Sequence, residues 1–222
     1  MSVWALGVHI GHDRGACLVK DGIVMVSIPQ ERIDRIKHSR AMSLPYEAID
    51  AVLKYCHIQP EQINCVGLSA DAMETGSITP IVRQDFFQHY MCQVPFFSVD
   101  HHISHAESVY SMSGNEKRLI LIADGGGDIY GQQAQAESLY LGYNGEITLL
   151  EQRLQDPPKR KLADIQNHVY PLIPKEMRRQ QISLSRKYEQ FTYLLGFGFG
   201  EAGKTMGLAS YGKKMLSNVS PN

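Results

Sequence analysis

The stretch V-W-A-L-G-V-H-I-G-H-D-R-G-A-C-L-V-K-D-G-I-V-M-V-S-I (3–28) predicts a strand, a polar glycine-containing loop, a second strand, a tight turn and a third strand. The apolar runs that predict the strands are Val3–Val8, Ala16–Val19 and Ile23–Ile28. Asp21-Gly22 is typical of the two-residue turn that joins antiparallel strands. The sequence therefore begins with an antiparallel three-stranded unit that has one long polar loop.

The same order of elements recurs later in the chain. R-L-I-L-I-A (118–123) predicts a buried strand, and D-G-G-G-D (124–128) follows it as a glycine-rich loop. Ser138–Tyr143 and Glu146–Leu150 predict two more strands around an Asn144-Gly145 turn. Residue identities hardly match between the units, so the repeat is one of pattern rather than of sequence.

The segment between the two units reads as alternating helices and buried strands. Pro45–His57 carries Ile49, Val52, Leu53 and Cys56, the spacing of one helix face. Helices are also expected at Ile81–Tyr90 and His101–Met112, the latter with Ile103, Ala106 and Tyr110 on one side, and strands at Asn64–Ala70 and Pro95–Val99. The predicted fold class is α/β with a mixed sheet.

The last third of the chain has a different composition. Prolines and basic residues interrupt 155–186, which reads as a solvated linker or lid, with an anion site as the alternative. Tyr188, Phe191 and Leu195 then resume helical spacing before Gly196–Gly212, which is dense in glycine; a glycine-rich surface loop is the alternative to a phosphate-binding loop at 200–212. Within it, Gly203-Lys204-Thr205 does not make a Walker A loop, because no apolar strand feeds it and no long apolar helix follows.

Composition excludes several classes of protein. With 22 Lys+Arg against 23 Asp+Glu in 222 residues, the chain lacks the basic excess of a general nucleic-acid binder. No apolar run approaches the ~18 residues of a membrane-spanning helix, and the residues after Met1 do not read as a secretory signal. The four cysteines (17, 56, 65 and 92) form no C-x-x-C pair and are expected to be reduced, mostly core residues of a cytoplasmic protein.

The strongest candidate site is D-H-H-I-S-H (100–105). His101 and His105 are four residues apart, so on a helix they share a face and can bind one metal ion. Their place directly after a strand, where open α/β sheets bind their ligands, favours a metal site over the alternative of a pair of surface histidines. Asp124, at the end of another strand, is a third candidate ligand, and this donor set suits iron, manganese, zinc or magnesium.

The loop Asp124–Asp128 offers backbone N–H groups without side-chain obstruction, as phosphate-binding loops do. A glycine cluster alone is weak evidence, because turns use the same residues. Two such loops, each inside a strand–loop–hairpin unit, are more specific. This arrangement resembles the actin, Hsp70 and sugar-kinase ATPases, which hold a nucleotide between twin halves.

Five segments of the chain carry a family resemblance. In chain order they are G-H-D-R-G-A-C-L-V-K-D-G (11–22), Q-E-R-I-D-R-I-K-H (30–38), D-H-H-I-S-H-A-E-S (100–108), L-I-A-D-G-G-G-D (121–128) and K-Y-E-Q-F-T-Y-L-L-G-F (187–197) continuing to G-K-T-M-G-L-A-S-Y-G (203–212). Together they resemble the O-carbamoyltransferases of nodulation and antibiotic tailoring, in their N-terminal, Kae1-like part. The resemblance covers nearly the whole chain. It implies an actin-like ATPase fold, with residues 1–117 as the first half and 118–222 as the start of the second.

The resemblance also implies a chemistry. Family members make carbamoyl-adenylate from carbamoyl phosphate and ATP in a separate C-terminal domain, and the Kae1-like domain transfers the carbamoyl group to a hydroxyl of a small molecule. On this pattern His12 would act at the acceptor hydroxyl, and His101, His105 and Asp124 would bind a divalent metal. The phosphate would be lined by Gly125, Gly126 and Gly127, while Lys204 and Lys37 would face anionic ligand groups.

The chain departs from the family at Arg14, where a serine is usual, and at Pro29, where an acidic residue is usual. It is also less than half as long as its relatives, so a missing C-terminal half or a second chain is expected as partner. Two alternatives stay open: a non-catalytic nucleotide- or metal-binding module that requires a partner chain, and a kinase or ATPase of the actin-like superfamily.

Overall fold

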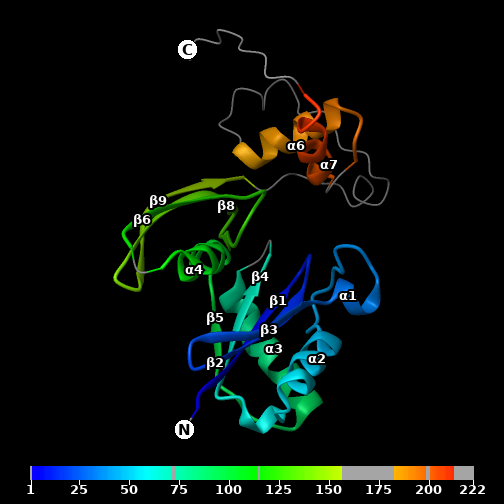
Figure 1. Ribbon diagram of the computed structural model, residues 1–222, viewed down its shortest axis with the longest axis vertical. Helices are drawn as coiled ribbons and strands as arrows, with labels where there is room; N and C mark the ends of the chain where they lie inside the picture. Colours follow the sequence, from blue (N-terminus) through cyan, green and yellow to red (C-terminus); the bar gives the residue numbers. More distant parts are fainter. Residues whose placement is uncertain (1, 72–73, 115, 157–182, 199–200, 213–222) are drawn as a thin grey trace. The chain divides into compact units, whose positions relative to one another are not determined.

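The computed structural model describes residues 2–71, 74–114, 116–156, 183–198 and 201–212 (Figure 1). The chain divides into two compact units. The first unit comprises Met1–Ile122 and Gly126–Pro157, and the second comprises Ala123–Gly125 and Pro158–Asn222. None of the helices in the described ranges is long and apolar enough to cross a membrane.

A five-stranded mixed sheet forms the base of the first unit, in the order β3-β2-β1-β4-β5. Its strands are β1 (Trp4–Ile10), β2 (Gly15–Lys20), β3 (Ile23–Pro29), β4 (Cys65–Ala70) and β5 (Phe96–Ser98). The first three pair antiparallel, whereas β1, β4 and β5 run parallel. This confirms the strands expected from the opening stretch and the mixed α/β class.

The main core lies on one face of this sheet. Alternate residues of β1, among them Leu6, Val8 and Ile10, are buried against α2 (Tyr46–Cys56) and α3 (Thr75–Tyr90). In α2, Ile49, Val52 and Leu53 are buried as the helical spacing predicts. Two short helical turns, α1 (Glu31–Asp34) and η1 (Pro60–Gln62), complete the connections.

Both hairpin turns form as their sequences predict. Asp21 and Gly22 have φ angles of 50° and 82°, and Asn144 and Gly145 have 53° and 81°. Positive φ at both central residues defines the turn whose twist matches paired antiparallel strands. The local turn chemistry therefore sets the register with which each turn begins the pairing of its two strands.

The second sheet of the first unit packs against α4 (His101–Ser113). Its strands run in the order β6-β8-β7, with β9 also paired to β8: β6 (Arg118–Ala123), β7 (Ile129–Tyr130), β8 (Gln133–Tyr143) and β9 (Glu146–Gln155). Ala106 and Tyr110 of α4 form a small core with Ile120, Ile122 and Tyr140. The expectation that Ile103 shares this buried side is wrong, since Ile103 is 39% exposed and His102 occupies the buried position one turn before Ala106.

The described part of the second unit contains α6 (Leu184–Leu194) and α7 (Ala202–Ala209). Helix α6 confirms the helical spacing of Tyr188 and Phe191. The surface loop considered for 200–212 is wrong for most of that range, because Ala202–Ala209 is helical despite Gly203 and Gly207. The expected linker lies mostly in 157–182, outside the described residues.

Candidate metal and acyl-transfer site

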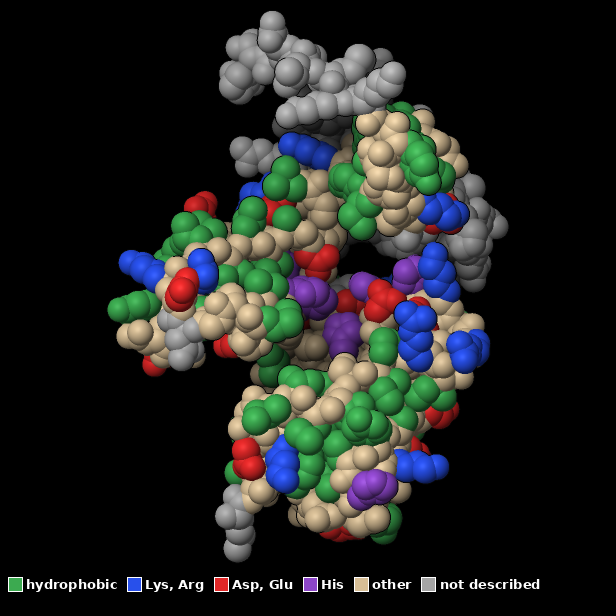
Figure 2. Space-filling view, viewed as in Figure 1, with side chains coloured by type: hydrophobic (Ala, Val, Ile, Leu, Met, Phe, Trp, Pro, Cys, Tyr) green, Lys and Arg blue, Asp and Glu red, His purple; other side chains and the backbone are tan. Residues whose placement is uncertain are grey.

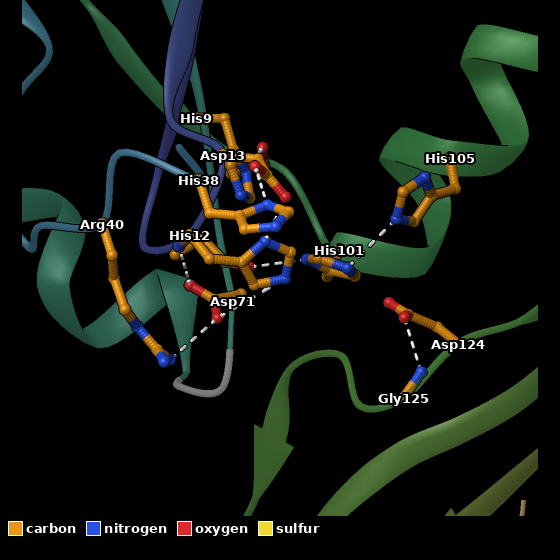
Figure 3. A network of polar contacts seen from close by, with 12 residues as sticks. His9, His12, Asp13, His38, Arg40, Asp71, His101, His105, Asp124 and Gly125 are labelled. Atoms are coloured by element: carbon orange, nitrogen blue, oxygen red, sulfur yellow. Dashed lines mark hydrogen bonds and ion pairs between the residues drawn. The ribbon is translucent and has the colours of Figure 1, made fainter. Parts of the chain in front are cut away.

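The loop after β1 holds His12 through a buried carboxylate (Figure 3). The backbone N–H of His12 donates to Asp71 Oδ1 at 2.9 Å, and His12 Nε2 lies 3.9 Å from Asp71 Oδ2. Gly11 has a φ of 110°, and a Cβ there would stand 1.4 Å from Asp71 Oδ1. Only glycine at position 11 allows this carboxylate to reach the loop.

The imidazole of His12 is oriented by Asp13. His12 Nδ1 lies 2.7 Å from Asp13 Oδ2, and His38 Nδ1 lies 2.8 Å from Asp13 Oδ1. Partial burial raises the pKa of Asp13, but the hydrogen bonds from His38 and His12 outweigh it and leave the pKa below its usual value. An ionised Asp13 can only accept a hydrogen bond, so Nδ1 of His12 carries the hydrogen and the lone pair of a neutral His12 lies on Nε2.

Asp71 connects three segments and was not predicted from the sequence. It follows β4 directly, is 5% exposed, and also faces Arg40, whose Nη2 lies 3.4 Å from Asp71 Oδ2. An acidic residue immediately after a buried parallel strand is the signal that could have identified it. Its partner His12 is 59 residues away, so no local pattern links the two.

The two histidines of α4 come together as the spacing predicts. His101 Nδ1 lies 2.8 Å from the carbonyl oxygen of Ala70. A carbonyl can only accept, so Nδ1 carries the proton and Nε2 presents its lone pair. His105 Nε2 lies 3.1 Å from His101 Nε2. Two imidazoles bound to one ion at about 2.1 Å, with an N–metal–N angle of roughly 90–110°, are separated by about 3.0–3.4 Å.

Two further histidines were missed by the sequence analysis. His9, on β1, has Nδ1 2.9 Å from Ser69 Oγ, and its ring centroid lies 5.8 Å from that of His101 and 6.4 Å from that of His12. Burial, and then the neighbouring His101, lowers the pKa of His9 to about 4, so its ring is neutral near neutral pH. His102 is buried with Nδ1 2.7 Å from Ser138 Oγ.

Together these side chains form a histidine cluster, which we define as His9, His12, His38, His101 and His105. They come from β1, from the two loops that Asp13 joins and from α4. Figure 2 shows histidine side chains gathered beside acidic and basic ones on one face of the first unit. His9 bridges the proposed base, His12, and the proposed ligand, His101.

Asp124 follows β6 directly and is tied to its own neighbours. Its Oδ1 accepts from the backbone N–H of Gly125 at 2.5 Å, and its carbonyl oxygen accepts from the hydroxyl of Ser185 at the start of α6. Arg186 Nε donates to the carbonyl oxygen of Gly125 at 3.3 Å. Helix α6 thus fixes the backbone at the beginning of the glycine-rich loop.

The rest of that loop contains glycines in two kinds of surroundings. A Cβ at Gly127 would stand 2.3 Å from Gln135 Oε1 and 2.8 Å from His102 Cδ2, whereas Gly125 and Gly126 have nothing within 4 Å. Asp128 closes the loop, with Oδ1 accepting from Thr75 Oγ1 at 2.8 Å. Burial raises the pKa of Asp128 to about 6.

Of the two lysines named from the sequence, Lys37 belongs to the first unit and Lys204 to the second. Lys37 is exposed after α1 and makes none of the described polar contacts with the histidine cluster. Lys204 is on α7 in the second unit, where its ammonium pairs with Glu201 and lies 5.9 Å from the Phe197 ring centroid. The structure brings His101 and His105 together, and connects His12 to them through His9.

The chain resembles several solved structures. The YeaZ protein of Pseudomonas aeruginosa matches with a TM-score of 0.47 and 12% identity over 78% of this chain and 82% of its own. A full-length HypF, solved in the phosphate- and nucleotide-bound form, matches with a TM-score of 0.41 and 14% identity over 66% of this chain and 18% of its own.

Sequence relatives extend well beyond the length of this chain. The nodulation protein NolNO of Sinorhizobium fredii is 31% identical over 221 residues, which cover 90% of this chain and 28% of NolNO. The uncharacterized protein MJ1051 of Methanocaldococcus jannaschii is 28% identical over 123 residues, 55% of this chain and 22% of its own. The chain thus spans less than a third of the length of these relatives.

The family model for the carbamoyltransferase N-terminus matches residues 73–220. This range includes the α4 histidines, the glycine-rich loop and α7, and so three of the five segments on which the sequence resemblance depends. The chain belongs to the carbamoyltransferase N-terminus family.

Proposed function

We propose that this protein provides the acyl-transfer site of a carbamoyltransferase. The reaction moves a carbamoyl group from carbamoyl-adenylate, made from carbamoyl phosphate and ATP, to a hydroxyl of a small-molecule acceptor. Family membership supports the carbamoyl chemistry. The observation that carries the proposal is the pair His101–His105, whose Nε2 atoms lie 3.1 Å apart.

His101, His105 and Asp124 are the proposed ligands of a divalent metal. The distance of 3.1 Å between the Nε2 atoms supports the two histidines, and the resemblance to the family supports Asp124 as the third ligand. Two imidazoles and a carboxylate suit iron, manganese or zinc, with magnesium as the hard-ion alternative. When bound, such an ion supplies positive charge that stabilises the phosphate oxygens of the adenylate.

His12 is the proposed general base. Its Nε2 takes the proton of the acceptor hydroxyl while Nδ1–H stays hydrogen-bonded to Asp13. The hydroxyl oxygen forms a bond to the carbamoyl carbon, the bond from that carbon to the phosphate oxygen breaks, and AMP leaves. The products are a carbamate ester and AMP, and the proton on His12 returns to solvent or to the departing phosphate.

The proposed phosphate contacts come from Gly125, Gly126 and Gly127, and Lys204 and Lys37 are proposed to face anionic groups of the donor. The open surroundings of Gly125 and Gly126 support a close approach of phosphate to the backbone N–H groups. We place the division between the two ATPase halves at 117/118, in the connection between α4 and β6.

The S. fredii relative is longer than this chain, which covers 28% of it, so the test supplies the remaining part of that relative. The direct test combines the protein with the C-terminal part of the S. fredii relative in trans, as a reconstituted enzyme. With ¹³C-carbamoyl phosphate, ATP and a panel of hydroxyl compounds, we expect a ¹³C-labelled carbamate ester and AMP, detected by NMR and mass spectrometry.

Two other results would replace this proposal. A phosphorylated acceptor with ADP, and no carbamate, would indicate a kinase of the actin-like superfamily. Nucleotide and metal binding without any product in the presence of the C-terminal part would indicate a non-catalytic binding module.

A further inference from the structure

A cavity of about 390 Å³ lies on the face of the first sheet opposite the main core. Its floor consists of residues that alternate with the buried ones, such as Gly7 and His9 between Leu6, Val8 and Ile10. The volume is within the range of small-molecule sites. All of the lining residues belong to the first unit.

The strand register explains why this face is hollow. Gly7 pairs with Cys17 on β2 and with Gly67 on β4, and Cys17 pairs with Ser27 on β3. These four adjacent positions form a row of small side chains across the sheet. Cys17 Sγ covers Gly7, where a Cβ would stand 2.5 Å from it. Gly67 leaves room, since its Cβ would meet only Val99 Cγ2 at 3.7 Å.

The next row brings the cavity to the histidine cluster. His9 pairs with Gly15 on β2 and with Ser69 on β4, and all three line the cavity. Asp13 lines it too, and its Oδ2 accepts from His12 Nδ1 at 2.7 Å. The wall of the cavity therefore includes the carboxylate that orients the proposed base.

The chemistry of the lining excludes an anionic occupant. No lysine or arginine is among the lining residues, and the one ionised group, Asp13, has its oxygens engaged by His12 and His38. The remaining polar groups include hydroxyls of serines on β3, β4 and α4, together with the imidazole of His9. Hydroxyls both donate and accept hydrogen bonds, so they match other hydroxyls.

We infer that this cavity binds an uncharged molecule rich in hydroxyl groups, which is the carbamoyl acceptor if the proposed function holds. This assignment rests on that function for the role of the molecule, but not for its binding. The assignment also places the acceptor and the donor at different sites, because the lining of the cavity contains no lysine or arginine to bind the phosphates of the donor.

Alkylation of Cys17 tests the binding directly. Burial raises the pKa of the Cys17 thiol, so iodoacetamide is applied at mildly alkaline pH and the labelled peptides are quantified by mass spectrometry. We expect methyl α-glucopyranoside, a neutral polyol, to slow alkylation of Cys17 in a saturable way and to leave Cys56 on α2 unchanged. Unchanged Cys17 labelling, or equal protection by inorganic phosphate, would overturn the inference.

A cavity-filling variant provides the matched comparison. Gly67→Val adds three carbons to the floor without displacing backbone, and we expect the glucoside to protect Cys17 about tenfold less effectively. Thr148→Val, at an exposed strand position of the second sheet, is the control and should behave like wild type. Wild-type protection in Gly67→Val would contradict the assignment.

Kinetics of the reconstituted enzyme separate this inference from the proposed function. Gly67→Val should raise the KM for the acceptor and leave the KM values for ATP and carbamoyl phosphate unchanged. Wild-type acceptor kinetics in this variant would contradict the assignment of the cavity as the acceptor site but would leave the proposed carbamoyltransferase function unaffected. Protection of Cys17 by the glucoside, combined with no carbamate product from any acceptor, would support binding in the cavity and contradict the proposed function.

Discussion

At the scale of single residues, His12 is held by contacts on its backbone and on its ring. Asp71 accepts from its N–H, and Asp13 orients its imidazole. The sequence predicted His12 from the family motif, but neither Asp71 nor His9, because their partners are brought together by strand pairing rather than by local spacing. The register His9↔Ser69 is the kind of information that only the folded sheet provides.

We predict that His12→Asn lowers carbamoyl transfer by the reconstituted enzyme ~10²–10⁴-fold, because the general base is lost. Binding of ATP should stay within twofold of wild type, as measured by calorimetry. His57→Asn, at an exposed histidine after α2, is the control. An unchanged rate in His12→Asn would make His12 a structural residue.

His9 makes stability depend on pH. Burial, then His101, lowers its pKa to about 4 from 6.5, so between these pH values the unfolded chain binds a proton there that the folded chain does not. The free energy of unfolding should fall as pH drops through this window, by about 3 kcal/mol for this residue. Asp128, with its pKa raised to about 6, acts in the opposite direction.

Comparing the pH dependence of the free energy of unfolding in wild type and in His9→Asn separates the contribution of His9 from that of Asp128, which both proteins contain. Urea unfolding of metal-free protein, at several pH values from 7 to 4, should give a smaller acid-side loss of stability in the variant. Parallel profiles for the two proteins would show that His9 titrates normally.

At the scale of elements, the bounds of helix α4 were predicted to within one residue. Its buried residues were predicted only in part. His102 rather than Ile103 precedes Ala106 in the core, because Ser138 on β8 provides the hydrogen bond that a buried imidazole requires. Helix α7 was predicted as a loop because glycines at 203 and 207 mask a run of good helix formers. Where helix-forming residues and glycines alternate in this way, the local sequence does not determine whether the segment is a helix or a loop.

The glycine-rich loop gives a paired prediction. Gly127→Ala should destabilise the protein by about 1–3 kcal/mol, because its Cβ must displace Gln135 or His102. Gly126→Ala, with open space around it, should change stability by less than about 0.5 kcal/mol and weaken binding of adenylate instead. Chemical denaturation and calorimetry measure the two effects, and equal stabilities of the two variants would contradict the packing described here.

At the scale of the whole molecule, the second sheet exposes apolar side chains on the face away from α4. Leu119 and Leu121 of β6 are 69% and 61% exposed, whereas Ile120 and Ile122 between them are buried. The alternation of exposed and buried residues along β6 shows which side chains supply this surface.

We predict that this surface drives self-association. Leu119→Gln combined with Leu121→Gln should weaken association in sedimentation velocity experiments and change the free energy of unfolding by less than about 0.5 kcal/mol. An association constant equal to that of wild type would exclude this face as the contact.

The central claim is that the α4 histidine pair binds a metal ion, and calorimetric titration with Fe(II), Mn(II) and Zn(II) tests it most directly. We predict one site per chain in wild type and in His57→Asn, and none in His101→Ala, with circular dichroism confirming that each variant is folded. Metal binding by His101→Ala with the stoichiometry and affinity of wild type would contradict the assignment.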